Sequence, residues 1–397
     1  MAADPYIKDY LMTAGPTPVP PAVTQAMAGP AMYHRAPAFV EVYARALDNL
    51  KKVFQTRNDV LVFAASGSGA MESAVANLAR RDQPAVVASC GKFGERWAEL
   101  CDAFGARTVH HETEWGQKID PVELDRVLGE NEGVEVVFTT LSETSTGVVN
   151  DVPALTEVAH RHGALIAVDA VSGLGAVPVK MDEWGVDAVV AGSQKALMCP
   201  PGLGFAAVGE RALERAEAGP GGRYYFDWVK TARGQRKDPP DSPFTPAATL
   251  FVGLDVALQM IETEGLEQVF ARHALLGRAA REAVKGLDLE LFGPEDEGAN
   301  VVTAIKLPDT IDGGKVPKLM RDRYGVTIAG GQAQLKGKIA RIAHCGYFGA
   351  FDIITTIAAF EMAMRELGHE LELGAGVAAA QRVFLESGVP VPAPAPA

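Results

Sequence analysis

Short apolar runs alternate with amphipathic stretches between about residues 60 and 210. Several runs are apolar at every position, which is typical of parallel strands that helices cover on both faces. The predicted strands are 60–65, 85–90, 106–111, 134–141, 164–170, 188–193 and 204–208. The predicted helices between them are 69–80, 94–104, 121–130 and 153–162. This alternation indicates an α/β domain built on a mostly parallel sheet.

A second, smaller α/β block follows. Residues 219–246 are rich in Gly, Pro and charge and are expected to form a long excursion before a helical run over 249–286. The block has predicted strands at 300–308, 326–330 and 338–345, and predicted helices at 315–324 and 351–367. We therefore expect an N-terminal arm (1–20), a large domain (21–270), a small C-terminal domain (271–386) and a disordered Pro/Ala tail (387–397).

Composition narrows the class of protein. The chain has 397 residues with a formal net charge of -13, which argues against nucleic acid or an anionic membrane as its partner. No apolar run approaches the roughly 20 residues that span a bilayer, and the N-terminus has no basic segment followed by a long apolar core. The four cysteines are scattered without metal-type spacing or a disulfide framework. We expect a cytoplasmic protein without a metal site.

The residues that follow each strand are the first candidates for function, because open α/β sheets bind ligands at the carboxyl ends of their strands. The segment "ASGSGAMES" follows the first predicted strand, and a helix is expected to begin near Gly69. Backbone N–H groups at that helix start, with the hydroxyls of Ser66 and Ser68, would make a phosphate cradle. A Gly-rich turn with a serine N-cap is the alternative interpretation.

Reactive and charged side chains stand at other strand ends. Lys195 follows the apolar run 188–191, where desolvation lowers the pKa of an amine and makes it a nucleophile, although most lysines are solvated. Asp169 ends an apolar strand, either as the cap of a turn or as a buried carboxylate against a cationic ring nitrogen. Thr144 lies in a turn-forming segment past a third strand, and Phe93 follows the second strand as a packing or ring-stacking residue.

Arg341 is the most informative residue of the second block. Strand alternation places it on the same face as Ile339 and Ala343. An arginine on an apolar face needs an anion, and a ligand carboxylate and a structural salt bridge are equally good partners at this point. A phosphate cradle, a stacking aromatic, a buried aspartate, a reactive lysine and a carboxylate-binding arginine together suit pyridoxal phosphate and an amino acid.

The ordered motifs resemble those of the class V aminotransferases, fold-type I pyridoxal-phosphate enzymes that include alanine–glyoxylate and serine–glyoxylate aminotransferases. The resemblance covers nearly the whole chain, through "SGSGAMES", "ETSTGV", "VDAVSGLGAVPVKMDEWGVD", "GSQKALMCPPGLG" and "GKIARIAHCG". It implies a mostly parallel seven-stranded sheet in the large domain, pyridoxal 5'-phosphate as cofactor, and a homodimer with active sites at its interface.

The resemblance also implies the roles of individual residues. Lys195 corresponds to the Schiff-base lysine and Asp169 to its catalytic partner at the pyridinium nitrogen. Arg341 corresponds to the residue that binds the substrate carboxylate, and Thr245 to one that reaches the cofactor phosphate across the dimer interface. The other cofactor-binding residues implied are Ser68, Gly69, Ala70, Phe93, Thr144, Val171 and Gln194.

Two positions differ from the animal alanine–glyoxylate enzymes. Phe93 stands where those enzymes carry a tryptophan, and Ser242 stands roughly where they carry a tyrosine near the phosphate. The expected function is transfer of an amino group from a small L-amino acid, alanine or serine, to a 2-oxo acid such as glyoxylate. The alternatives are a lyase of the cysteine desulfurase type and a catalytically silent partner protein on the same scaffold.

Overall fold

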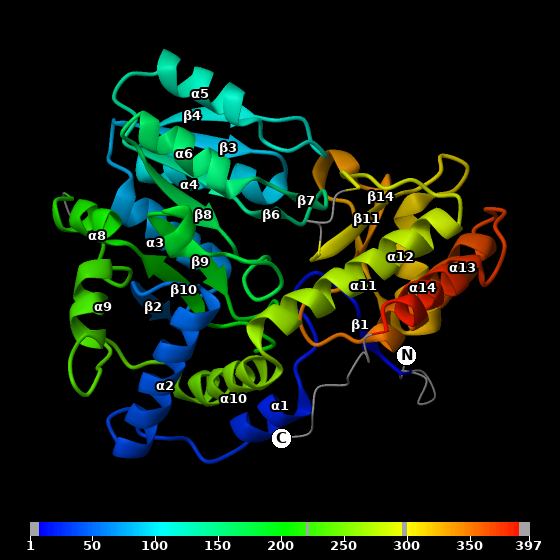
Figure 1. Cartoon of the computed structure of the whole chain (residues 1–397), viewed down its shortest axis with the longest axis horizontal. Helices are drawn as coiled ribbons and strands as arrows, with labels where there is room; N and C mark the ends of the chain where they lie inside the picture. Colours follow the sequence, from blue (N-terminus) through cyan, green and yellow to red (C-terminus); the bar gives the residue numbers. More distant parts are fainter. Residues whose placement is uncertain (1–7, 220–221, 296–299, 389–397) are drawn as a thin grey trace.

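A computed structural model describes residues 8–219, 222–295 and 300–388 of the chain. Its largest element is a seven-stranded sheet in the order β2-β10-β9-β8-β5-β3-β4 (Figure 1). Only β10 runs antiparallel to its neighbours within this sheet of the described chain, so the predicted mostly parallel seven-stranded sheet is confirmed. The strands are β2 (Asp59–Phe63), β3 (Pro84–Ser89), β4 (Arg107–Glu112), β5 (Val136–Thr140), β8 (Leu165–Asp169), β9 (Ala188–Gly192) and β10 (Gly204–Val208).

Both faces of this sheet are covered by helices, which explains why its strands are continuously apolar. In β9, for example, Val189 and Ala191 join the core on one face, while Ala188 and Val190 join the core on the other. One face packs against α3 (Gly67–Leu78), α4 (Lys92–Phe104), α8 (Glu210–Glu217) and α9 (Trp228–Gln235). The other packs against α2 (Pro37–Val53), α5 (Pro121–Glu130), α6 (Val152–Arg161) and α10 (Ala248–Glu264).

A smaller sheet with its own apolar core forms the C-terminal block (Figure 1). It is antiparallel in the order β11-β14-β13, and the predicted smaller α/β block is therefore confirmed. A separate parallel pair joins β1, near the start of the chain, to β12. The elements are β1 (Tyr10–Leu11), β11 (Val302–Lys306), β12 (Val326–Thr327), β13 (Ala329–Gly330), β14 (Ile339–Ala343), α11 (Leu266–Gly286), α12 (Val316–Tyr324), α13 (Ala350–Glu366) and α14 (Ala375–Glu386).

Two predicted segments differ from the structure. The helical run expected over 249–286 is two helices, because Gly265 has φ 85° and ends α10 before α11 begins. The long excursion over 219–246 contains the helix α9, which Asp227 caps by accepting a hydrogen bond from the Lys230 N–H at 2.9 Å. The buried Trp228 anchors this helix by donating its indole N–H to Ser73 Oγ at 3.1 Å.

The predicted domain boundaries stay predictions. Residue 270 lies inside α11, and residues 389–397 of the predicted tail lie outside the described residues. The remaining short elements are α1 (Pro21–Met27), α7 (Met181–Trp184), β6 (Ser142–Glu143), β7 (Val148–Val149) and the 3₁₀ helices η1 (Gly313–Lys315) and η2 (Ala333–Leu335). Within the described ranges, no helix combines the length and apolarity that crossing a membrane requires.

Candidate active site

One cavity gathers residues from the carboxyl ends of several strands of the large sheet. Because β2, β3, β5, β8 and β9 run in the same direction, the loops that follow them meet at one edge. Six predicted site residues line this cavity, which places them together. The lining residues are Ser66, Gly67, Ser68, Met71, Phe93, Arg96, Asp169, Val171, Ser172, Gln194 and Lys195.

Lys195 follows β9 and is buried, and the N-terminal segment covers it. Its Nζ donates a hydrogen bond to the carbonyl oxygen of Ala14, and its own carbonyl accepts one from Thr17 Oγ1 at 2.8 Å. Gly15, with φ 136°, is required beside it, because a Cβ there would overlap the lysine side chain. Burial lowers the pKa of the Lys195 amine, which favours the neutral, nucleophilic form.

Asp169 ends β8 and is 5% exposed. Its Oδ1 accepts the Val171 N–H at 2.7 Å, so the carboxylate does cap the following turn. No hydrogen bond to Oδ2 is seen within the described residues, and the side chain lines the cavity. Burial raises the pKa of Asp169 to about 7. A positive group in the cavity would favour its charged form.

Apolar side chains line the cavity from two other elements. Phe93 stands in the first turn of α4, and Val171 stands just after β8. Close approach of Val171 to α3 requires a glycine, because a Cβ at Gly67 would lie 2.8 Å from Val171 Cγ2. These two side chains supply the apolar surfaces that a flat aromatic ring needs.

The start of α3 forms a polar end of the cavity. The helix begins at Gly67, two residues earlier than predicted, with Ser66 as its N-cap. The hydroxyl of Ser66 accepts the Gly69 N–H at 3.4 Å, and its carbonyl accepts the Ala70 N–H at 3.1 Å. Gly69 and Ala70 are therefore engaged within the cap, whereas Ser68 lines the cavity. The serine-capped turn and a candidate anion site coexist here.

Arg341 lies on β14 and is 5% exposed. Its Nε and Nη2 donate to the Gly330 carbonyl at 3.0 and 2.8 Å, and its Nη1 donates to the Thr144 carbonyl at 2.5 Å. No carboxylate within the described residues forms a salt bridge with it, so the structural salt bridge considered above is not seen. Burial lowers the pKa of Arg341 to about 10, which leaves the guanidinium charged at neutral pH.

Arg341 does not line the cavity itself but reaches its wall through a short chain of contacts. The carbonyl of Thr144 accepts from Arg341, and the Thr144 hydroxyl lies 3.4 Å from that of the cavity residue Ser172. Three of the five guanidinium N–H groups are occupied by carbonyl oxygens. Two N–H groups therefore remain for a ligand.

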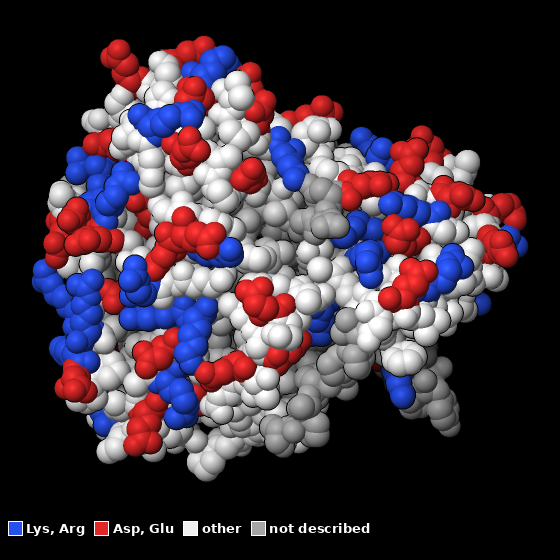
Figure 2. Space-filling view, in the orientation of Figure 1, with Lys and Arg blue, Asp and Glu red and all other residues white. Residues whose placement is uncertain are grey.

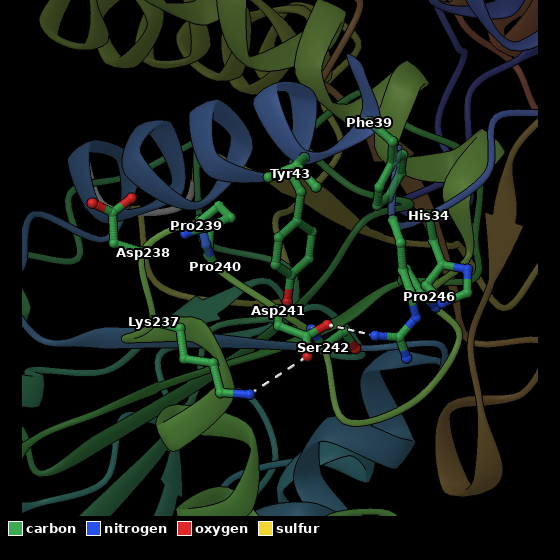
Figure 3. A pocket seen from close by; sticks show the side chains of 12 residues that line it. His34, Phe39, Tyr43, Lys237, Asp238, Pro239, Pro240, Asp241, Ser242 and Pro246 are labelled. Atoms are coloured by element: carbon green, nitrogen blue, oxygen red, sulfur yellow. Dashed lines mark hydrogen bonds and ion pairs between the residues drawn. The ribbon is translucent and has the colours of Figure 1, made fainter. Parts of the chain in front are cut away.

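Thr245 is not brought to this cavity within one chain. It lines a separate pocket with Ser242 and Tyr225, in the loop before α10. An adjoining pocket, which also includes Ser242, is shown in Figure 3. There the Asp241 carboxylate pairs with Lys237 Nζ at 3.6 Å and with Arg35 Nη1 at 3.7 Å. The role of Thr245 across a dimer interface stays a prediction.

Glu143 is fully buried beside the site and was not predicted as a site residue. Its Oε2 accepts the N–H groups of Phe93 and Gly94 at 3.1 and 2.8 Å, so it fixes the start of α4. Burial raises the pKa of this carboxyl. The glycine Gly91 in "CGKFG" is the signal that the sequence offered. In the structure it is needed because a Cβ at this position would lie 2.5 Å from Glu143 Cγ. Arg96, which also lines the cavity, was missed as well.

The cavity fits pyridoxal phosphate. Asp169 offers a carboxylate oxygen to a ring nitrogen, Lys195 offers an amine, and the start of α3 offers donors to a phosphate. Gln194 Oε1 is buried without a hydrogen-bond partner among the described residues, which leaves a polar atom for a ligand to satisfy. The fold and site together define a pyridoxal-phosphate enzyme of the α/β class.

Comparison with known proteins identifies the family. The family described as "Aminotransferase class-V" matches residues 9–345. The chain is 42% identical to the "Soluble hydrogenase, small subunit" of Synechococcus sp. (95% of this chain, 98% of that one) and 36% identical to the serine–glyoxylate aminotransferase of Methylorubrum extorquens (96% and 97%). The crystal structure of pyridoxamine–pyruvate aminotransferase from Mesorhizobium loti superimposes with a TM-score of 0.90 at 30% identity, covering 97% of this chain and 98% of that one.

The chain therefore belongs to the class V aminotransferase family. It is an aminotransferase whose cofactor is pyridoxal 5'-phosphate and whose substrates are an amino acid and a 2-oxo acid.

Proposed function

We propose that this enzyme moves an amino group from a small L-amino acid, alanine or serine, to a 2-oxo acid such as glyoxylate. The observation that carries the proposal is that Lys195 and Asp169 line one cavity, and that Arg341 is bonded to Thr144, whose hydroxyl lies 3.4 Å from that of the lining residue Ser172. The name of the Methylorubrum relative supports serine as donor and glyoxylate as acceptor. A cytoplasmic location is supported by the four cysteines, all of which are unpaired.

Lys195 and Asp169 are proposed to have separate roles in the reaction. When bound, pyridoxal phosphate supplies a carbonyl carbon that takes the amino group and a ring that accepts electron density. Lys195 is proposed as the Schiff-base lysine, because its buried amine has a lowered pKa, and its Nζ would also move the proton at the substrate Cα. The Asp169 carboxylate would hold the ring nitrogen in its protonated form.

Arg341 and the N-terminal segment position the substrate. The two unoccupied N–H groups of Arg341 are proposed to bind the α-carboxylate, which suits the planar guanidinium fork. The segment around Ala14 covers Lys195 and limits the access of water to its amine.

A spectrum and a donor panel test this function. Purified enzyme with pyridoxal phosphate is expected to show a visible absorption band that borohydride reduction abolishes. Alanine, serine and aspartate are then supplied singly with glyoxylate, and glycine and the new 2-oxo acid are measured by chromatography. We expect equal amounts of both products from alanine or serine, and far less of either product with Lys195→Ala. A wild-type enzyme that makes no glycine from either donor contradicts the proposal.

The desulfurase alternative is disfavoured by the state of the cysteines. A desulfurase needs an accessible, reactive thiolate. All four cysteines are buried, and burial raises the pKa of Cys345, the one closest in sequence to Arg341, to about 11. Sulfide release from cysteine, measured alongside the donor panel, would restore this alternative.

A role as a subunit of a larger assembly is the second candidate, because the 42% identical relative is named as the small subunit of a soluble hydrogenase. The donor panel separates the two functions when it is run on the chain alone. Transamination by the isolated chain supports the enzyme. A folded, cofactor-loaded chain that transaminates nothing supports the subunit role.

We propose further that the enzyme is a homodimer in which Thr245 contacts the phosphate of the neighbouring subunit, because Thr245 lies apart from the cavity of its own chain. Mixing two inactive variants, Thr245→Ala and Lys195→Ala, tests this. A mixed dimer would have one site with both changes and one with neither, so activity is expected to return in part. Verified subunit exchange without any return of activity contradicts the cross-subunit role.

A further inference from the structure

We propose that Arg96 helps to bind the cofactor phosphate. Its guanidinium holds the Ser68 hydroxyl, which would donate to a phosphate oxygen, and its positive charge would balance the charge of the phosphate. Arg96 stands in α4 and lines the same cavity as Ser68. Its Nη1 donates a hydrogen bond to Ser68 Oγ at 3.1 Å. Its guanidinium carbon lies 5.4 Å from the centroid of the Phe93 ring. Arg96 thus joins the polar end of the cavity to the aromatic side chain that lines it.

Charge is the first argument for this role. A phosphate monoester carries about 1.5 to 2 negative charges at neutral pH, whereas the chain carries a formal net charge of -13. The face in Figure 2 mixes cationic and anionic side chains. Among the described residues that line this cavity, only Arg96 and Lys195 are cationic. Lys195 is proposed to use its amine in the covalent link, which leaves Arg96 to balance the phosphate.

The second argument is that Arg96 forms no salt bridge or hydrogen bond with a carboxylate within the described chain, although its charge attracts the Asp169 carboxylate in the same cavity at longer range. The acidic residues nearest to it on α4 are engaged elsewhere. Glu95 accepts from Lys92 at 3.2 Å and from the indole of Trp115 at 3.1 Å, and Glu99 accepts from Lys92 at 2.9 Å. A half-buried guanidinium without a directly paired carboxylate is a good receptor for an anionic ligand.

The direction of the hydrogen bond is the third argument. Arginine only donates, so Ser68 Oγ is the acceptor and its hydroxyl proton points elsewhere. No acceptor for that proton is seen among the described residues. A phosphate oxygen at the start of α3 would receive it, and the cation behind the hydroxyl would strengthen the bond.

Cofactor titration tests the role without depending on turnover. Wild-type, Arg96→Gln and Arg96→Lys apoproteins are titrated with pyridoxal phosphate and with pyridoxal, which lacks the phosphate, and binding is followed by absorbance. Arg96→Gln is expected to weaken pyridoxal phosphate binding about tenfold or more, and pyridoxal binding less than about threefold. Arg96→Lys should lie between, because it keeps the charge without the fork.

A matched control and a double variant sharpen the result. Arg57→Gln removes the same charge from a side chain that is 98% exposed and should change neither affinity. Ser68→Ala combined with Arg96→Gln should weaken binding by less than the product of the single effects, because both act on one contact. Independent effects of the two substitutions overturn the path through Ser68. Circular dichroism verifies folding, and Arg96→Lys carries the test if Arg96→Gln does not fold.

The other possible outcomes of the titration also test the role of Arg96. Equal weakening of pyridoxal phosphate and pyridoxal assigns Arg96 to holding Phe93 and overturns the proposal, as does unchanged affinity for both. The inference rests on the cofactor site of the proposed function, so wild-type binding is measured first. If the wild-type protein binds no pyridoxal phosphate, the proposed cofactor site itself is contradicted. If the wild-type protein binds pyridoxal phosphate no better than Arg96→Gln does, only the role of Arg96 is contradicted.

Discussion

Arg272 and Arg341 are both largely buried, but the protein itself satisfies only one of them. Arg272 on α11 forms a two-point ion pair with Glu264, at 2.7 and 3.0 Å, and donates further to the carbonyls of Gly346 and Phe348. Arg341 has only carbonyl partners within the described chain. A buried guanidinium with a complete set of partners holds the fold together, whereas one that lacks an anion is prepared for a ligand.

The same contrast extends to the cavity. Lys195 and Asp169 are buried near it, yet neither forms a salt bridge within the described residues. Each therefore bears a desolvation cost that folding alone does not offset. Substitutions that break the Arg272 ion pair should therefore lower stability, whereas substitutions of Arg341, Lys195 or Asp169 should lower activity.

The largest effect is expected at Lys195. Lys195→Ala should lower transamination by about 10²–10⁴-fold or more, because both the covalent link and the proton transfer are lost. The thermal midpoint of the cofactor-free protein should stay close to that of the wild type, since no ion pair is broken. Rates are measured with alanine and serine, and unfolding by circular dichroism. Near-normal turnover in the variant would remove the assignment.

The next effect is on stability rather than chemistry. Glu264→Gln leaves the largely buried Arg272 without its carboxylate, and breaking such a pair costs about 3–5 kcal/mol. Urea unfolding of the apoprotein measures this loss, and the relative use of amino donors should be unchanged. Lys52→Gln is the control, because Lys52 forms a pair with Glu262 in which both side chains are more than half exposed. An equal cost for both variants would contradict the contrast.

Arg341→Lys should change substrate use without changing stability much. The ammonium keeps the charge but loses the planar fork, a loss of about 1.5–3 kcal/mol for a charged hydrogen bond. We expect a higher KM for amino and 2-oxo acids and an unchanged visible spectrum. A variant with wild-type kinetics would show that Arg341 serves the Thr144 and Gly330 carbonyls only.

The smallest effect concerns pH and the cofactor-free protein. Because burial raises the pKa of Asp169 to about 7, the folded apoprotein binds a proton more tightly than the unfolded chain, whose aspartates have pKa values near 3.9. Its stability should therefore fall as the pH rises from about 4 to 7. Asp169→Asn should reduce this fall and make the apoprotein relatively more stable at pH 8, while it weakens cofactor binding. Urea unfolding at several pH values measures the slope, and identical slopes in both proteins would contradict the expectation.

Much of the fold could be predicted because burial on both faces leaves a direct mark on the sequence. The continuously apolar 188–191 run located β9, and Lys195 followed from its end. Glu143 and the contact between Ala14 and Lys195 left weaker marks, because each depends on residues distant in sequence. The break at Gly265 was harder to see, since helical periodicity continues on both sides of it.

The N-terminal segment that covers Lys195 also sets the order in which the molecule can be completed. Ala14 contacts a residue 181 positions later, and Tyr10 pairs with Val326 in β12. During synthesis this segment is made long before its strand partner at Val326. Such long-range contacts form slowly. We therefore expect the covering of Lys195 to be one of the later steps of folding, because it depends on contacts between residues far apart in the chain.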